Sequence, residues 1–186
     1  MMRPDLVDAQ IRLLDQLLFR KGALNRLQKE FILLAVSAEN NNSYFPALHC
    51  QTLQFLGVKP EQSQQVAIDH REANLSESDV VLLDFARKLA SSPHSFTESD
   101  VESLRKWNFN DEQILEAVLM VGLTQLLNSI QMGLGTESDF KPRVIFPVKE
   151  MNPQVVSERQ IQEPEFSGEV VSDDPDFEIV ERFAGE

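Results

Sequence analysis

The sequence of 186 residues contains a single cysteine, Cys50. One cysteine can form neither an internal disulfide nor an intramolecular dithiol cycle, and it excludes a zinc site built from several cysteines. We also find no run of apolar residues in the sequence that is long enough to span a bilayer. Its N-terminus carries Asp5 and Asp8 where a secretory signal would be apolar. We therefore expect a cytoplasmic protein without a membrane segment.

Basic residues are scarce, and the formal net charge is −13. Residues 1–150 carry 15 Lys and Arg against 20 Asp and Glu, whereas residues 151–186 carry 2 against 10. Phosphate binding requires a basic face, so the composition argues against nucleic acid as a partner. It offers no polybasic membrane anchor either.

Apolar residues recur at helical spacing through most of the chain, without the strict alternation of a half-buried strand. We predict an all-α fold. Candidate N-caps precede each of the later helices, and Asn42 or Ser43 is the candidate N-cap of a helix that contains Pro46 in its first turn. The predicted helices are 6–19, 23–37, 46–55 and 61–70, followed by helices that start after Ser76, Thr97 and Asn110.

The last predicted helix, residues 111–134, carries two neighbouring rows of apolar residues. Such a broad face predicts burial in the core, at an oligomer interface, or in both. Gly122 either lets another helix approach closely or is simply tolerated at some cost in helix stability. The rows are Ile114, Val118, Gly122, Leu126, Ile130 and Leu115, Leu119, Leu123, Leu127.

We divide the chain into a helical domain, residues 1–148, and a C-terminal tail, residues 149–186. The tail is acidic, irregular and interrupted by prolines, and we predict that it is largely disordered. It retains apolar residues, and residues 176–183 are a candidate motif for a protein partner. The alternative is a solvated tail that raises solubility.

The stretch from Glu30 to His49 carries the most informative spacing. It resembles the motif of the AhpD-like alkylhydroperoxidase family, in the carboxymuconolactone decarboxylase superfamily. That motif is a glutamate, then Ser-Ala-x-Asn-x-Cys-x-Tyr-Cys-x-x-x-His. The two cysteine positions hold Asn42 and Phe45 here. The matching residues are Ser37, Ala38, Asn40, Tyr44, Ala47 and His49.

The resemblance extends over roughly residues 1–148. In the order of its segments the chain is similar to the peroxidase-related branch of the family. It departs at Ser129, where the family commonly has arginine after the asparagine that corresponds to Asn128. The resemblance implies an AhpD-like helical bundle that assembles into a homo-oligomer with active sites near subunit contacts. We predict no cofactor.

In that family the cysteine pair lies at a helix N-terminus, which stabilises the reactive thiolate. The family's glutamate and histidine relay protons to and from the thiols, and these roles map onto Glu30 and His49. Asn42 and Phe45 cannot perform thiol chemistry, so the dithiol mechanism cannot run from these positions. Tyr44 is a candidate pocket-lining residue.

Three functions remain open. The first is a binding or structural protein without dithiol peroxidase activity. The second is a cysteine-independent enzyme of the decarboxylase or isomerase type that uses Glu30 and His49 as acid and base. The third is a one-cysteine alkylhydroperoxidase that uses Cys50, although a buried free cysteine is the commoner state.

The remaining histidines and the tryptophan suggest no further site. We expect His70 and His94 to be exposed and Trp107 to lie in the core. A metal bound by Glu30, His49 and another carboxylate stays open, but no His-x-x-His or similar cluster supports it, and no metal is predicted.

Overall fold

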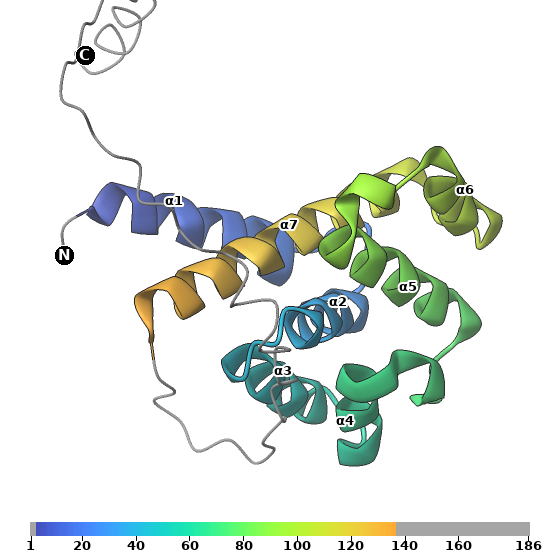
Figure 1. Ribbon diagram of the computed structural model, residues 1–186, viewed down its shortest axis with the longest axis horizontal. Coiled ribbons are helices and arrows are strands. Elements are labelled where there is room, and N and C mark those ends of the chain that lie inside the picture. The colour runs from blue at the N-terminus through green and yellow to red at the C-terminus, as the bar shows by residue number, and fades with distance from the viewer. Residues whose placement is uncertain (1–2, 137–186) are drawn as a thin grey trace, which may run out of the picture. The chain divides into compact units, whose positions relative to one another are not determined.

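The computed structural model describes residues 3–136, which belong to one compact unit. Every regular element in this range is helical, as the sequence predicts (Figure 1). The predictions about the tail and about the domain boundary at residue 148 lie outside the described residues. The elements are α1 (Pro4–Leu14), η1 (Asp15–Phe19), α2 (Arg26–Glu39), α3 (Tyr44–Phe55), α4 (Pro60–Asp69), η2 (His70–Glu72), α5 (Glu77–Ser91), η3 (Pro93–Ser95), α6 (Glu98–Lys106) and α7 (Asp111–Leu134).

Capping side chains set the starts of α2, α5, α6 and α7. Helices α5, α6 and α7 begin directly after the three predicted caps. At α7 the side chain of Asn110 accepts the N–H of Gln113, while the Gln113 side chain accepts the N–H of Asn110, which satisfies two free donors at once. The same box, from Asn25 and Gln28, starts α2 three residues later than predicted.

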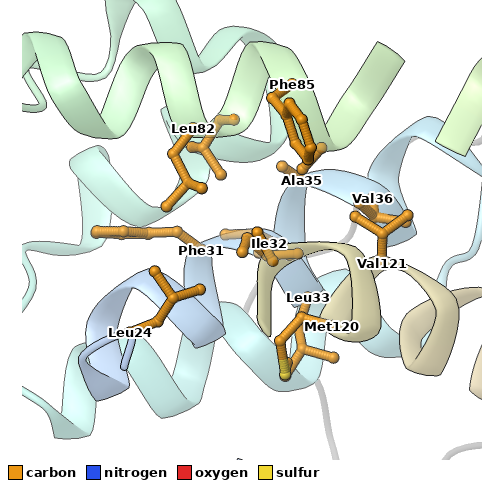
Figure 2. Close-up of a cluster of buried hydrophobic side chains, with 14 of the residues drawn as sticks. Leu24, Phe31, Ile32, Leu33, Ala35, Val36, Leu82, Phe85, Met120 and Val121 are labelled. Carbon is orange, nitrogen blue, oxygen red and sulfur yellow. The ribbon is translucent and has the colours of Figure 1, made fainter. Parts of the chain in front are cut away.

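Helix α2 lies at the centre of the helical unit, with α3, α5 and α7 packed around it (Figure 1). Its residues 29–37 are all buried, so the helix has no solvent-facing side there. Figure 2 shows Leu33 and Val36 directed toward the two α7 residues Met120 and Val121. On another side of α2, residues of α5 complete the apolar core. This central helix also carries Glu30, so the core holds that carboxyl group in place.

The predicted burial of α7 is only partly right. Of the two apolar rows, Ile114 and Leu123 are buried, but the core face is centred elsewhere on the helix. It uses the small or slender side chains that fit against α2, namely Ala117, Met120, Val121 and Thr124. Four outer apolar residues are solvent-exposed in the single chain, so the alternative that places them in the core is wrong. They are Leu115, Val118, Leu119 and Leu126.

Gly122 is also exposed, and a Cβ built on it meets nothing within 4 Å in the described part of the chain. A close approach of another helix at Gly122 is therefore not seen within residues 3–136. By length and composition α7 passes the test for a membrane-spanning helix, with a mean hydropathy of 1.4 over its best window. This finding corrects the prediction that the sequence has no apolar run long enough to span a bilayer. The core helix of a soluble protein passes the same test, and one face of α7 packs in the core.

Candidate functional site

The structure brings Glu30 and His49 together from two packed helices. Glu30 lies on α2 and His49 on α3, and His49 Nδ1 is 2.7 Å from Glu30 Oε2. Both side chains are buried. The other carboxylate oxygen, Oε1, accepts hydrogen bonds from Arg26 Nε at 3.0 Å and Nη2 at 2.5 Å. The three residues form a continuous chain of charged and polar groups that ends at the histidine ring.

The environment keeps Glu30 ionised. Burial disfavours the carboxylate, but the hydrogen bond from His49 and the positive charges of His49 and Arg26 outweigh it and lower the pKa of Glu30. An ionised carboxylate only accepts hydrogen bonds, so His49 Nδ1 is the donor. In the neutral imidazole the other nitrogen, Nε2, is then an acceptor. Nε2 is buried and has no hydrogen-bond partner within the described residues.

Aromatic rings pack against this histidine. The ring of Phe45 stacks on that of His49, with 5.9 Å between the centroids and 18° between the planes. Tyr44 meets Phe45 edge to face, with 5.0 Å between the centroids. Phe45 therefore occupies one face of the imidazole with apolar surface, and Tyr44 lies next to it.

Asn42 caps helix α3. Its Oδ1 accepts the N–H groups of Tyr44 and Phe45, each at 2.9 Å, and its Nδ2 donates to Gln131 Oε1 of α7 at 2.8 Å. Of the two candidate caps, Ser43 occupies the N-cap position but makes no side-chain capping bond, and Asn42, one residue earlier, accepts these bonds instead. The cap explains why α3 starts at Tyr44, two residues before Pro46.

Cys50 follows His49 on α3 but belongs to the core. It is fully buried, and its Sγ donates to the carbonyl oxygen of Ser63 at 3.3 Å. Burial raises the pKa of the thiol to about 11, against which the Ser63 contact acts only weakly. Since the thiolate is the nucleophile, these surroundings are those of an inert structural thiol.

Sequence reasoning missed Arg26, although its position one turn before Glu30 is the spacing at which opposite charges pair on a helix. It also misplaced two other residues. His70 is buried rather than exposed, because it lies between Asp84 and Arg87, with Nε2 2.9 Å from Asp84 Oδ1. Trp107 is 40% exposed rather than in the core.

Within residues 3–136 no group of three or more His, Cys, Asp or Glu is placed to hold a metal ion. One hollow, of about 420 Å³, lies between α5 and α6, and another, of about 490 Å³, lies at the start of α2. Glu30 and His49 line neither of them.

No family model and no curated protein matches the chain. Solved structures do match. One is from Ralstonia eutropha JMP134 and is described as an alkylhydroperoxidase AhpD core and an uncharacterized peroxidase-related protein. It is 29% identical, with a TM-score of 0.70 over 78% of each chain.

The chain has an AhpD-like fold. A second structure, an uncharacterized peroxidase-related protein from Silicibacter sp. TM1040, supports this. It is 24% identical and covers 75% of this chain and 73% of its own, again with a TM-score of 0.70. The likenesses confirm the all-helical AhpD-like fold expected from the motif and support the AhpD-like family.

Proposed function

We propose that this AhpD-like chain has no dithiol peroxidase activity and serves a binding or structural role. The observation that carries the proposal is what stands at the two positions that correspond, by resemblance, to the cysteine pair. Asn42 uses its side chain to cap α3, and Phe45 uses its ring to cover His49. Both side chains have packing roles, and neither can attack a peroxide.

The state of Cys50 supports the same proposal. A one-cysteine peroxidase needs a thiolate that a peroxide can reach. The Cys50 thiol is fully buried, its pKa is raised to about 11, and it is hydrogen-bonded to Ser63. At neutral pH it stays protonated and inaccessible.

Hydroperoxide reduction by the purified full-length protein, with thiol and dithiol donors, tests the proposal. Cys50→Ser is the matched variant. We expect both proteins to show only the rate of the protein-free blank. Turnover at an enzymatic rate that disappears in Cys50→Ser would refute the proposal and establish a one-cysteine peroxidase.

One observation favours a second candidate function, a cysteine-independent acid–base enzyme. The Glu30 carboxylate accepts from Nδ1 of His49, so in the neutral ring Nε2 is the basic nitrogen, and it has no hydrogen-bond partner in the described residues. Because Nε2 is buried, a small organic acid or lactone would reach it only after the side chains around it move. If a panel of such compounds reveals an activity, Glu30→Gln and His49→Ala must each reduce it at least about 100-fold, the usual lower range for a general base. An activity unchanged in both variants would exclude this candidate.

We also propose that the chain assembles into a homo-oligomer through the outer face of α7. Leu115, Leu119 and Leu126 are 60, 44 and 42% exposed and lie on one long helix. Contiguous apolar surface of this kind is typical of subunit interfaces. Sedimentation of the full chain and of Leu119→Arg tests this. A smaller assembly in the variant is expected, and a monomeric wild-type protein would refute it.

A further inference from the structure

A hollow of about 490 Å³ at the start of α2 has an unusual lining for so acidic a chain. Every charged residue that lines it is cationic, namely Arg20, Lys21, Arg26 and Lys29. The other lining residues come from the same continuous segment, residues 18–25. The hollow therefore gathers four cationic side chains in a chain whose net charge is −13.

Three of the four cations are paired with carboxylates, and two of these, Lys29 and Arg26, serve the structure of the loop. Lys29 is buried, pairs with Glu116 at 2.7 Å, and donates to the carbonyl oxygens of Leu17 and Arg20. Glu116 also accepts the N–H of Leu24 at 2.6 Å, so this pair fixes both ends of the loop. All the bonds of Arg26 go to Glu30 and to a backbone carbonyl.

The loop can close over this pair because residue 22 is glycine. A Cβ on Gly22 would lie 1.9 Å from Glu116 Oε1. The hollow is thus a preformed part of the fold, held by a buried ion pair and by a close backbone approach. Preformed sites bind at a lower entropic cost than sites that must order on binding.

The other two cations retain unused donors. Arg20 donates only its Nε–H, to Asp15 Oδ2 at 2.8 Å. Its terminal amino groups therefore stay available for a planar anion with two oxygens. Lys21 is exposed, and no carboxylate among residues 3–136 pairs with it. Two neighbouring residues in the lining of the hollow therefore present spare donors.

The uncharged part of the lining is mainly apolar. Phe19 is 61% exposed, which is high for a phenylalanine, and its ring lies 4.8 Å from the guanidinium carbon of Arg26. Ala23 and Leu24 also line the hollow. An inorganic anion would leave this apolar surface in water, whereas an organic anion would cover it.

We propose that the hollow binds an organic carboxylate with an apolar body. The carboxylate is held by Lys21 and the terminal amino groups of Arg20, and the apolar body lies against Phe19 and Ala23. The proposal names a ligand class for the proposed binding role but does not depend on the loss of peroxidase chemistry. Hydroperoxide turnover tests the loss of peroxidase activity, and carboxylate binding tests the ligand site.

Octanoate is the probe, titrated into the ¹⁵N-labelled full-length protein while amide shifts are recorded. Octanol supplies the same body without the charge, and inorganic phosphate supplies an anion without the body. The double variant Arg20→Gln/Lys21→Gln removes the spare donors, and its only described loss is an exposed ion pair, which contributes little to stability. The matched control is Arg71→Gln/Lys106→Gln, which changes two cations of the hollow between α5 and α6.

We expect octanoate to shift amides mainly within residues 18–26, and the Arg20/Lys21 double variant to weaken binding at least tenfold, or about 1.4 kcal/mol. The control variant should bind as the wild type does, and octanol and phosphate should bind at least tenfold more weakly than octanoate. Equal affinity in the Arg20/Lys21 variant would overturn the proposal. So would equal affinity for octanol or phosphate, or shifts confined to the exposed face of α7.

Discussion

Replacing Asn42 with alanine tests the packing role that the structure gives to this position. The change removes both functions of the side chain. Its oxygen no longer accepts the N–H groups of Tyr44 and Phe45, and its amide no longer donates to Gln131. Asn42 is 3% exposed, so water replaces these partners poorly.

The expected cost follows from the bonds lost. Loss of an N-cap side chain typically costs about 1 kcal/mol. Loss of the hydrogen bond to Gln131 adds about 1 kcal/mol, because one typical bond contributes ~0.5–1.5 kcal/mol. We therefore expect Asn42→Ala to lower the free energy of unfolding by about 2 kcal/mol, which lowers Tm by roughly 5–10 °C for a domain of this size.

Urea unfolding followed by circular dichroism measures this cost. Asn25→Ala is the matched control, because Asn25 caps α2 from an exposed position and has no partner on another helix within residues 3–136. It should lose about 1 kcal/mol. A double-mutant cycle with Gln131→Ala isolates the contact with α7. If Asn42→Ala costs no more than Asn25→Ala and shows no coupling to Gln131, the proposed packing role is wrong.

Three further predictions concern titratable groups. The pKa of Glu30 is lowered from 4.5, so its stabilising effect is present above that pH and is lost as the pH falls below it; Glu30→Gln should flatten the acid limb of the stability–pH curve, and an unchanged limb would contradict this. Burial, aided by Arg87 and Arg71 and opposed by Asp84, lowers the pKa of His70 from 6.5. The unfolded chain then binds more protons than the folded chain, so stability should fall as the pH drops from 7 through 6.5. His70→Gln should lose that slope, and an equal slope in the wild type and the variant would contradict the lowered pKa. The Cys50 thiol, with its pKa raised to about 11, should react with a disulfide reagent at pH 8 only after urea unfolding, and equally fast labelling of the folded protein would show that it is accessible.

The sequence predicts where the later helices start better than it predicts which face of α7 is buried. Capping residues and apolar spacing are local signals, and they predicted the helix order and the starts of α5, α6 and α7. The orientation of α7 could not be predicted, because apolar residues occupy most of its circumference. Which of them face the core depends on the fit against α2, where Ala117 and Val121 pack.

The candidate site shows the same limit. The motif predicted a relation between Glu30 and His49, and the structure places them 2.7 Å apart. It gave no indication that Arg26 shares the carboxylate or that Asn42 reaches Gln131, 89 residues along the chain. Contacts between distant residues depend on how the helices pack. For the same reason the prediction that His70 is exposed is wrong, because η2 packs it between two residues of α5.

Restoring the cysteine pair tests the central proposal most directly. Asn42→Cys/Phe45→Cys should place two thiols at the start of α3, near Glu30 and His49, with thermal unfolding checked because the cap is lost. We expect the wild-type protein to reduce hydroperoxide no faster than the protein-free blank, and the double variant to form a reversible disulfide and to turn over hydroperoxide with a dithiol donor. A wild-type protein that already turns over hydroperoxide as fast as the double variant would contradict the proposal that this AhpD-like chain has lost peroxidase chemistry at Asn42 and Phe45.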